Sequence, residues 1–412
     1  MQDIIQVKKD ERALADILVA IVIGLYLTNV AVGIGRYVGF DSATISLAAK
    51  VLILGAIIRC ALVFINRINF AMMLSTYILV FTIVVQGVFF PENRQFLLGE
   101  GRGSVMESTV ATFVITILPA IYTIAVIQDF DILLRRLQNA AIGISAFTSA
   151  VILVYGGDAF EKYCMGFGIA MIFPTCLTIT KAASSNMPSL MKQGCIALAV
   201  MDIFAITMYG NRGAFVAVVA FTVYYFLWEQ IRQKKLIAIL ETGGILLVAG
   251  SYKQILKSIN DFAQSRGYFS RTLMSLSSDK VSDSGRSRLY EPIQREILEA
   301  PLKIRGINSD WETVGFYCHN LALELLHAFG VLLGGFCCLM VLYEICKILW
   351  RGKTDSRSIL LICLTFVFFP ICLVSDSVWE STWFWTWLVL VLLPDSQNNN
   401  TTSSSMRKER YG

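Results

Sequence analysis

The chain has 412 residues, of which 56% are hydrophobic and only 16% are charged, and its formal net charge is +5. So low a charged fraction argues against a soluble globular protein, and no nucleic-acid partner is expected. The hydrophobic residues form runs close to the length of about 20 residues that a helix needs to cross a bilayer. In lipid, backbone hydrogen bonds must be satisfied within each segment, so these runs predict helices. The expected fold class is an all-α polytopic membrane protein.

Hydropathy predicts about twelve transmembrane helices. The first, at 14–35, follows a short charged segment and is longer than the apolar core of a cleaved signal peptide. Residues 1–251 are expected to hold helices 1–9, and residues 319–394 are expected to hold helices 10–12. The later segments lie near 44–66, 69–90, 107–128, 139–156, 164–181, 194–210, 213–230, 236–251, 319–348, 357–374 and 378–394.

The distribution of Lys and Arg predicts that both termini are cytoplasmic. Counted over the short loops, about eighteen basic residues fall on one side of the predicted helices. Short loops on the cytoplasmic side of a membrane carry the excess of positive charge. The opposite side is therefore expected to be extracytoplasmic. It has only Arg36, Arg94, Arg102, Lys162 and Arg212.

One connection is far longer than the others. Residues 252–318, between predicted helices 9 and 10, form a large extracytoplasmic loop with aromatic residues, prolines and charges of both signs. Long connections in compact proteins are commonly functional, and the spacing of Ile297, Leu298 and Leu302 is typical of a helix. Residues 395–412 are polar and of low complexity, which predicts a disordered cytoplasmic tail.

Two features inside the predicted helices concern packing. Charged residues at membrane depth cost roughly 2.5–3.5 kcal/mol each, so Lys50, Arg59 and Asp202 are interpreted as paired with neighbouring helices. Gly330 and Gly334 form a GxxxG pair, which predicts close packing of another helix.

Arg212 stands at the expected outer junction of two helices, in the stretch MYGNRGAFV. Gly210 and Gly213 flank it and permit a tight turn and close backbone approach. Arg212 is either an interfacial anchor or a guanidinium offered to an anion, because its planar fork matches phosphate oxygens. Spacing alone does not separate these interpretations.

The long loop adds arginines in the stretch SGRSRLYEP. Arg286 and Arg288 alternate across a serine, and nearby acidic residues partly balance them. The simplest interpretation is a solvated charged surface. A phosphate site requires several such cations to converge in space.

Both histidines lie in the stretch FYCHNLALELLHAFG, where the loop meets an apolar helix. Asn320, Glu324 and His327 share a helical face, and polar side chains at the start of a transmembrane helix must face protein or water. His327 is interpreted as a hydrogen-bonded packing residue, whereas His319 can accept a proton or donate to phosphate. No further His, Cys or acidic residue stands at metal-ligand spacing, so no metal is expected.

Three of these stretches, in this order, resemble a known family. GNRGA at 210–214 matches a G-x-R-G-A element that opens a transmembrane helix, and Arg286 takes the arginine position of a loop element. HNLALELLHAFG at 319–330 matches H-N-x-x-L-E-x-x-x-x-x-G. With about a dozen helices and one large late loop, the chain resembles the O-antigen polymerase and O-antigen ligase superfamily. It departs from the family at APLKIRGINSDW, where Arg305 replaces the first glycine of a P-x-x-G-x-G element.

The resemblance implies a glycosyltransferase of the bacterial cytoplasmic (inner) membrane, acting at its outer face on undecaprenyl-diphosphate-linked oligosaccharides without metal or other cofactor. Departure of the diphosphate develops negative charge, which preorganised cations stabilise. The catalytic residues are then Arg212, Arg286 and His319. Arg288 is expected to help bind the diphosphate, and the expected supporting residues are Asn320 and Glu324.

The resemblance favours a polymerase that joins lipid-linked repeat units into O-antigen, capsule or exopolysaccharide. The main alternative is a ligase that transfers the glycan to lipid A-core, completing a lipopolysaccharide. A flippase for lipid-linked oligosaccharides is the alternative of another class, but its charges should line a central cavity and it needs no large outer loop. Expected partners are the lipid-linked oligosaccharide, membrane lipids, and a chain-length regulator and flippase of the same pathway.

The predicted topology can be tested with reporter fusions. A reporter inserted within residues 252–318 should register an extracytoplasmic location, because the positive charge of the short loops lies on the opposite side. Fusions within residues 395–412 serve as the cytoplasmic reference. A cytoplasmic location for the long loop would contradict the topology and the predicted site together.

Overall fold

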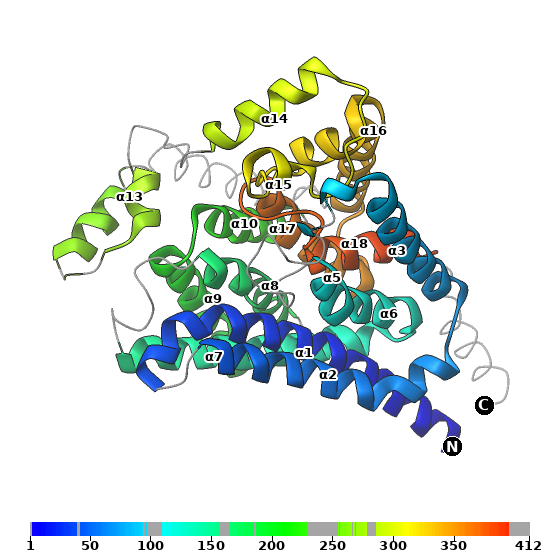
Figure 1. Ribbon diagram of the computed structural model, residues 1–412. Helices are drawn as coiled ribbons and strands as arrows, with labels where there is room; N and C mark the ends of the chain where they lie inside the picture. Colours follow the sequence, from blue (N-terminus) through cyan, green and yellow to red (C-terminus); the bar gives the residue numbers. More distant parts are fainter. Residues whose placement is uncertain are drawn as a thin grey trace.

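The computed structural model describes residues 2–38, 42–93, 95–96, 109–155, 165–184, 187–228, 254, 256–265, 267, 269–277 and 286–394. Over these ranges the regular secondary structure consists of helices, and there is no strand (Figure 1). Eight helices are long and apolar enough to cross a membrane, and three shorter apolar helices accompany them. The chain is therefore an all-α polytopic membrane protein.

Each predicted transmembrane segment that falls within the described residues overlaps a helix. The segment 236–251 and the tail 395–412 lie outside the described residues, so the number of twelve spans stays a prediction. The helices are α1 (Gln2–Val38), α2 (Ser42–Asn66), α3 (Phe70–Phe89), α5 (Thr109–Thr112), α6 (Leu118–Val126), α7 (Phe130–Tyr155), α8 (Met165–Ala182), α9 (Ser189–Tyr209), α10 (Arg212–Val223), α13 (Arg271–Ser277), α14 (Ser287–Glu299), α15 (Ser309–Val314), α16 (Leu321–Arg351), α17 (Ser356–Cys372) and α18 (Thr382–Leu392).

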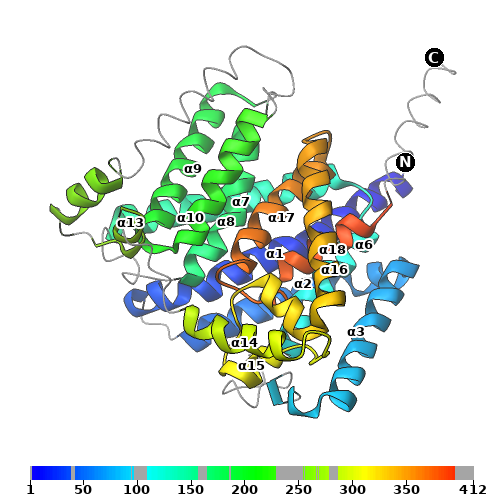
Figure 2. The ribbon, with the colours of Figure 1, turned by 90° about the horizontal axis from the view of Figure 1, so that it is seen from above.

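The bundle has a buried centre and an exposed edge. The apolar span of α8 is 72% buried, and α8 contacts α1, α7, α9, α10 and α17. The span of α3 is only 12% buried, and Figure 2 shows this helix at one edge of the bundle. Exposed apolar side chains on such an edge suit a surface that meets lipid. In Figure 2 the short helices α13, α14 and α15 lie on the side of the bundle away from the two chain termini, with α13 apart from α14 and α15.

The segment from α5 to α6 contains a π-helical turn at Phe113–Ile117. Pro119, in the first turn of α6, is the physical reason. Proline has no N–H to donate and its ring clashes with the carbonyl four residues earlier, so the hydrogen-bond ladder must shift there. The widened turn lies on the side of the bundle that faces α18, which contacts this segment and α6.

Two of the three charges predicted at membrane depth have polar partners on other helices. Arg59 forms an ion pair with Asp16 of α1, at 3.3 Å. Asp202 is fully buried and accepts a hydrogen bond from Ser145 of α7, at 2.6 Å. For these two residues the predicted pairing is confirmed. Lys50 is half-buried and makes no such contact within the described residues.

The helix α16 is broken at Gly330, whose φ of 74° and ψ of 169° are not helical. The loop before α15 fills the break. Val331 N–H donates to the carbonyl of Pro301 at 2.7 Å, and the N–H groups of residues 305–306 donate to the carbonyl of Ala328 at 3.0 Å. These bonds satisfy the backbone groups that the break exposes. The loop is thereby fixed to the middle of α16.

The break corrects two expectations about this helix. The segment 319–348 was predicted as one continuous helix, and the GxxxG pair was predicted to receive another helix. A Cβ at Gly330 would instead meet the backbone of Leu302 in the loop, at 3.1 Å. A Cβ at Gly334 would meet the carbonyl oxygen of Leu325 at 2.3 Å. Gly334 therefore packs against the first half of its own helix, which folds back beside the second half.

At the opposite end, the buried carboxylate of Glu11 joins three parts of the bundle. One oxygen pairs with Arg67, in the turn between α2 and α3. The other oxygen accepts hydrogen bonds from the backbone N–H groups of Gln128 and Asp129, at 3.0 and 3.1 Å, in the turn between α6 and α7. Glu11 is 1% exposed, so no solvent replaces these partners.

Replacing Glu11 with alanine should lower the thermal midpoint of the purified protein clearly. The change leaves a guanidinium and two N–H groups without their acceptor, and breaking a buried pair costs about 3–5 kcal/mol. Lys9→Ala is the matched control, because Lys9 is exposed on the same helix. Equal midpoints for the two variants would contradict this role.

Candidate functional site

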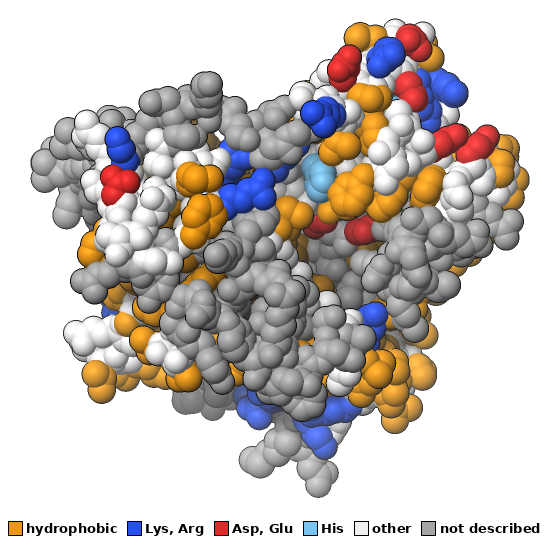
Figure 3. Space-filling view, turned by 60° about the vertical axis from the view of Figure 1, so that its left-hand side comes forward, with side chains coloured by type: hydrophobic (Ala, Val, Ile, Leu, Met, Phe, Trp, Pro, Cys, Tyr) orange, Lys and Arg blue, Asp and Glu red, His pale blue; other side chains and the backbone are white. Residues whose placement is uncertain are grey.

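A cavity of about 980 Å³ opens at the end of the bundle that carries α13 and α14. Its walls come from α10, α13, α14, the end of α17 and the turn before α16. The predicted residues Arg212, Arg286 and His319 all line it, together with Arg271. Figure 3 shows basic side chains and a histidine close together on one face of the molecule, with acidic side chains below the histidine.

Arg212 is placed by a tight turn between α9 and α10. Asn211 caps α10, because its side-chain oxygen accepts a hydrogen bond from Ala214 N–H at 2.7 Å. A Cβ on Gly210 would lie 2.6 Å from the Ile206 carbonyl oxygen and 3.0 Å from Gly168 of α8. The expected close backbone approach at Gly210 is thus confirmed. It places Arg212, the first residue of α10, in the cavity wall.

Arg271 was not identified from the sequence, and two serine and threonine hydroxyls place it here. Ser270 donates to the carbonyl of Thr207 at 2.7 Å, and Thr272 donates to the carbonyl of Gly210 at 2.7 Å. These bonds fix the start of α13 to the end of α9. Arg271, between the two, is thereby held at the cavity. No motif in the sequence marks this contact, since the chain positions are about sixty residues apart.

The two loop arginines differ in position. Arg286 immediately precedes α14, is half-buried and lines the cavity. Arg288 is exposed and does not line it. The structure therefore places Arg288 away from the other predicted cations, although its role stays a prediction.

The far half of α14 is held against α16 by Glu296. Its carboxylate bonds His327 Nε2 at 3.0 Å and pairs with Arg305 at 3.3 Å. His327 is 1% exposed and also bonds Ser309, at 2.8 Å. The interpretation of His327 as a packing residue is confirmed. The pKa of the Glu296 carboxyl is lowered: burial opposes this shift, but the hydrogen bond from His327 and the nearby charge of Arg305 outweigh it.

Arg305 has a structural role in this turn. Its guanidinium turns back to Glu296, which a glycine there would not reach. Gly306, the next residue, has φ of 84°, and a Cβ on it would lie 2.7 Å from Gln86 and Phe90. The turn therefore needs glycine at 306 to pack on α3.

His319 adopts φ of 56°, in the left-handed region that non-glycine residues seldom occupy. Its ring packs against the rings of Phe316 and Tyr317, with centroids 5.2 and 4.2 Å away. The imidazole interacts with the backbone of Ser375, which favours its protonated form, and Nδ1 is buried and has no hydrogen-bond partner among the described residues. Burial lowers the pKa of His319, as does the nearby charge of Arg286. The lowered pKa favours the neutral imidazole near pH 7.

Asn320 and Glu324 hold the backbone segments next to the cavity through hydrogen bonds. Asn320 caps α16 by accepting hydrogen bonds from two N–H groups at 3.1 Å each. Glu324 is 2% exposed and accepts from Val378 N–H at 2.8 Å and from the Ser377 hydroxyl at 3.2 Å. It therefore fixes the segment after α17, to which Ser375 of the cavity wall belongs.

Three buried groups that often bind metals converge beside this segment. Atoms of Asp310, Cys318 and Glu324 lie within 4.8 Å of one another, a proximity that spacing along the chain did not reveal. Both oxygens of Asp310 already accept backbone hydrogen bonds, and the Cys318 thiol donates to the Asn320 carbonyl. Only one oxygen of Glu324 has no partner. The group is thus better suited to share protons than to hold an ion, and the absence of a metal stays a prediction.

Two carboxyls in these connecting segments have a high proton affinity. Burial raises the pKa of Asp310, and the charge of Glu380 adds to the increase. Burial and Glu380 likewise raise the pKa of Asp376 to about 7. Asp376 directly follows Ser375 of the cavity wall. Near neutral pH these carboxyls therefore add less negative charge behind the cavity than their number suggests.

The cavity is built to attract an anion. Three arginines line it, and among the described residues of its wall none is acidic. The first residues of α10 and the residue before α14 also belong to the wall. N–H groups at the start of a helix carry partial positive charge and favour phosphate-like ligands. The geometry therefore fits a group such as a diphosphate.

Comparison with protein-family models, with curated proteins and with solved structures found no match for this chain.

Proposed function

We propose that the protein is a polysaccharide polymerase that joins undecaprenyl-diphosphate-linked oligosaccharide repeats at the outer face of the bacterial cytoplasmic membrane. The observation that carries the proposal is the convergence of Arg212, Arg286 and His319 on one cavity. These residues come from three stretches far apart in the chain that together resemble one enzyme superfamily. Arg271 adds a third guanidinium to the same wall.

In this reaction an acceptor hydroxyl attacks the anomeric carbon of the sugar linked to the donor diphosphate. A new C–O bond forms to the sugar, and the bond from that sugar to the diphosphate breaks. The lipid diphosphate leaves with the bonding electron pair, and the hydroxyl proton passes to a base. Guanidiniums that are already in position stabilise the negative charge of the leaving group at no cost of reorganisation. Arg212, Arg286 and Arg271 have this role.

His319 acts on the acceptor hydroxyl. A neutral imidazole in the cavity wall can accept a proton from the hydroxyl or orient it. A cationic histidine that binds diphosphate would need a raised pKa, whereas the pKa of His319 is lowered.

A transporter fits the same features less well. Basic side chains that serve a passage through the membrane should lie along its length. Here the three arginines meet at one end of the bundle, in a wall built partly from α13 and α14.

Single replacement of Arg212, Arg271, Arg286 or His319 by alanine should reduce chain extension by the purified protein. For each arginine a loss on the order of a hundredfold is expected, as for removal of one donor from an oxyanion site. The assay supplies a lipid-linked repeat to protein in nanodiscs and resolves products by length. Arg295→Ala is the control, because Arg295 is exposed on α14 and lies outside the cavity.

Protein yield and thermal midpoint are measured for every variant, so that loss of fold is not mistaken for loss of chemistry. Normal activity of the three variants Arg212→Ala, Arg286→Ala and His319→Ala would overturn the assigned roles. Equal losses in these variants and in Arg295→Ala would show that general positive charge, and not this cavity, supports the reaction.

A further inference from the structure

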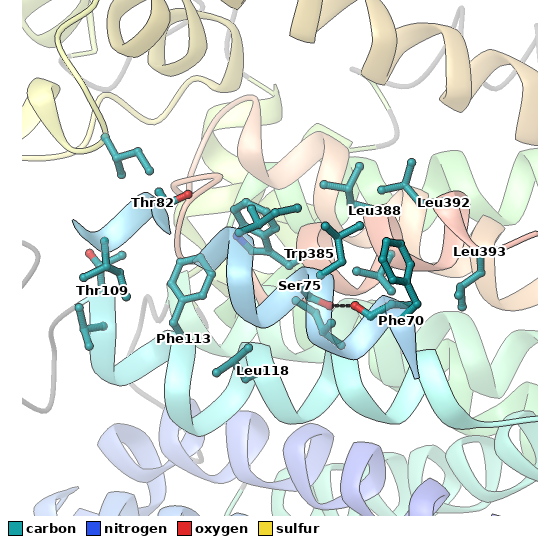
Figure 4. Close-up of a pocket in the computed structure, with 18 of the residues that line it drawn as sticks. Phe70, Ser75, Thr82, Thr109, Phe113, Leu118, Trp385, Leu388, Leu392 and Leu393 are labelled. Carbon is teal, nitrogen blue, oxygen red and sulfur yellow. Dashed lines mark hydrogen bonds between the residues drawn. The ribbon is translucent and has the colours of Figure 1, made fainter. Parts of the chain in front are cut away.

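A second hollow, of about 400 Å³, runs between α3, the segment from α5 to α6, and α18 (Figure 4). Its lining, which includes Leu74, is almost wholly hydrocarbon, and the side chains of Phe113 and Leu388 are turned toward it. We call it the apolar groove. Its two ends are marked by Phe70 and Leu393, and by Thr109 (Figure 4).

The groove covers most of the depth of a membrane. Along α3 its lining extends from Phe70 to Gln86, which corresponds to about 24 Å at a rise of about 1.5 Å per residue. The hydrocarbon core of a bilayer is about 30 Å thick, so an acyl chain of one leaflet covers only about half of it. A single chain that fills the groove must therefore be longer than an ordinary acyl chain.

The end of the groove at Thr109 adjoins the segment that forms part of the cavity wall. Thr109 Oγ1 donates to Glu380 at 3.0 Å, and the indole of Trp385, in the groove, donates to the carbonyl of Trp379 at 3.2 Å. Ser375 of the cavity begins the same segment. Five residues cover at most about 18 Å even when fully extended. The cavity and groove share no lining residue, and this short segment connects the wall of one with the end of the other.

We infer that the apolar groove holds the polyprenyl tail of a second lipid-linked substrate, the acceptor, while the cavity binds the diphosphate of the donor. This inference rests on the proposed function, in which both reactants are carried by lipid. The acceptor keeps its bond to its own diphosphate, so it must be held in place but needs no arginines to stabilise a leaving group. Thr109 and Gln86 then mark the end of the groove where the tail meets its head group.

The test uses the full-length protein in nanodiscs and undecaprenyl phosphate that carries a diazirine on its terminal isoprene unit. After illumination, peptide mass spectrometry locates the label. Labelling is expected near Phe70, Leu392 and Leu393, at the far end of the groove. A phospholipid with a diazirine at the end of one acyl chain serves as the competing probe, and its label is expected only near mid-depth, around Ile78 and Ile121.

Leu74→Trp narrows the groove and should reduce both polyprenyl labelling and chain extension about tenfold, the effect of about 1.4 kcal/mol of binding free energy. Met73→Trp is the matched control, because Met73 is exposed on the same helix and does not line the groove. Arg212→Ala should leave labelling in the groove unchanged. The unmodified protein gives the labelling result even where Leu74→Trp fails to fold.

The outcomes separate the inference from the proposed function. Chain extension without polyprenyl label at the far end of the groove, or equal labelling there by the phospholipid probe, would overturn the inference and leave the polymerase intact. Label at the far end, blocked by Leu74→Trp, in a protein that extends no chain would support a polyprenyl site and contradict the polymerase.

Discussion

The hydrogen bonds to the buried carboxylate of Glu324 organise the end of the bundle where the cavity lies. Glu324 accepts from Val378 and Ser377, and thereby fixes the connection between α17 and α18 to the start of α16. On one side of this connection Ser375 bonds the imidazole of His319. On the other side Glu380 accepts from Thr109. Burial of a polar group is costly unless hydrogen bonds compensate for it, so these two bonds help to fix both the cavity wall and the end of the groove.

The sequence predicted the class of fold and the residues that the cavity brings together. In lipid, a long apolar run can satisfy its own backbone hydrogen bonds only as a helix, so helices could be located from hydropathy alone. Arg212, Arg286 and His319 were found because each lies in a short stretch that resembles the same family, and His319 also stands where a polar loop meets an apolar helix. These signals are local in the chain. They require no knowledge of which helices are neighbours.

Features that depend on long-range contacts were missed or misinterpreted. Arg271 has no local signal, since hydroxyl bonds to the end of α9 place it. In α14 the buried positions are Ile293 and Ile297, whereas Leu298, whose spacing contributed to predicting this helix, is 80% exposed. The break at Gly330 was read as a helix-packing motif because loop backbone, unlike another helix, leaves no pattern in the sequence.

The most direct test compares surface and lipid-linked glycans from a strain lacking this protein with those of its parent. The account predicts that the ladder of long chains disappears, leaving single repeats on the final acceptor. Long chains that accumulate on the lipid carrier, with none transferred, would contradict it and indicate a ligase. An unchanged ladder would contradict both activities.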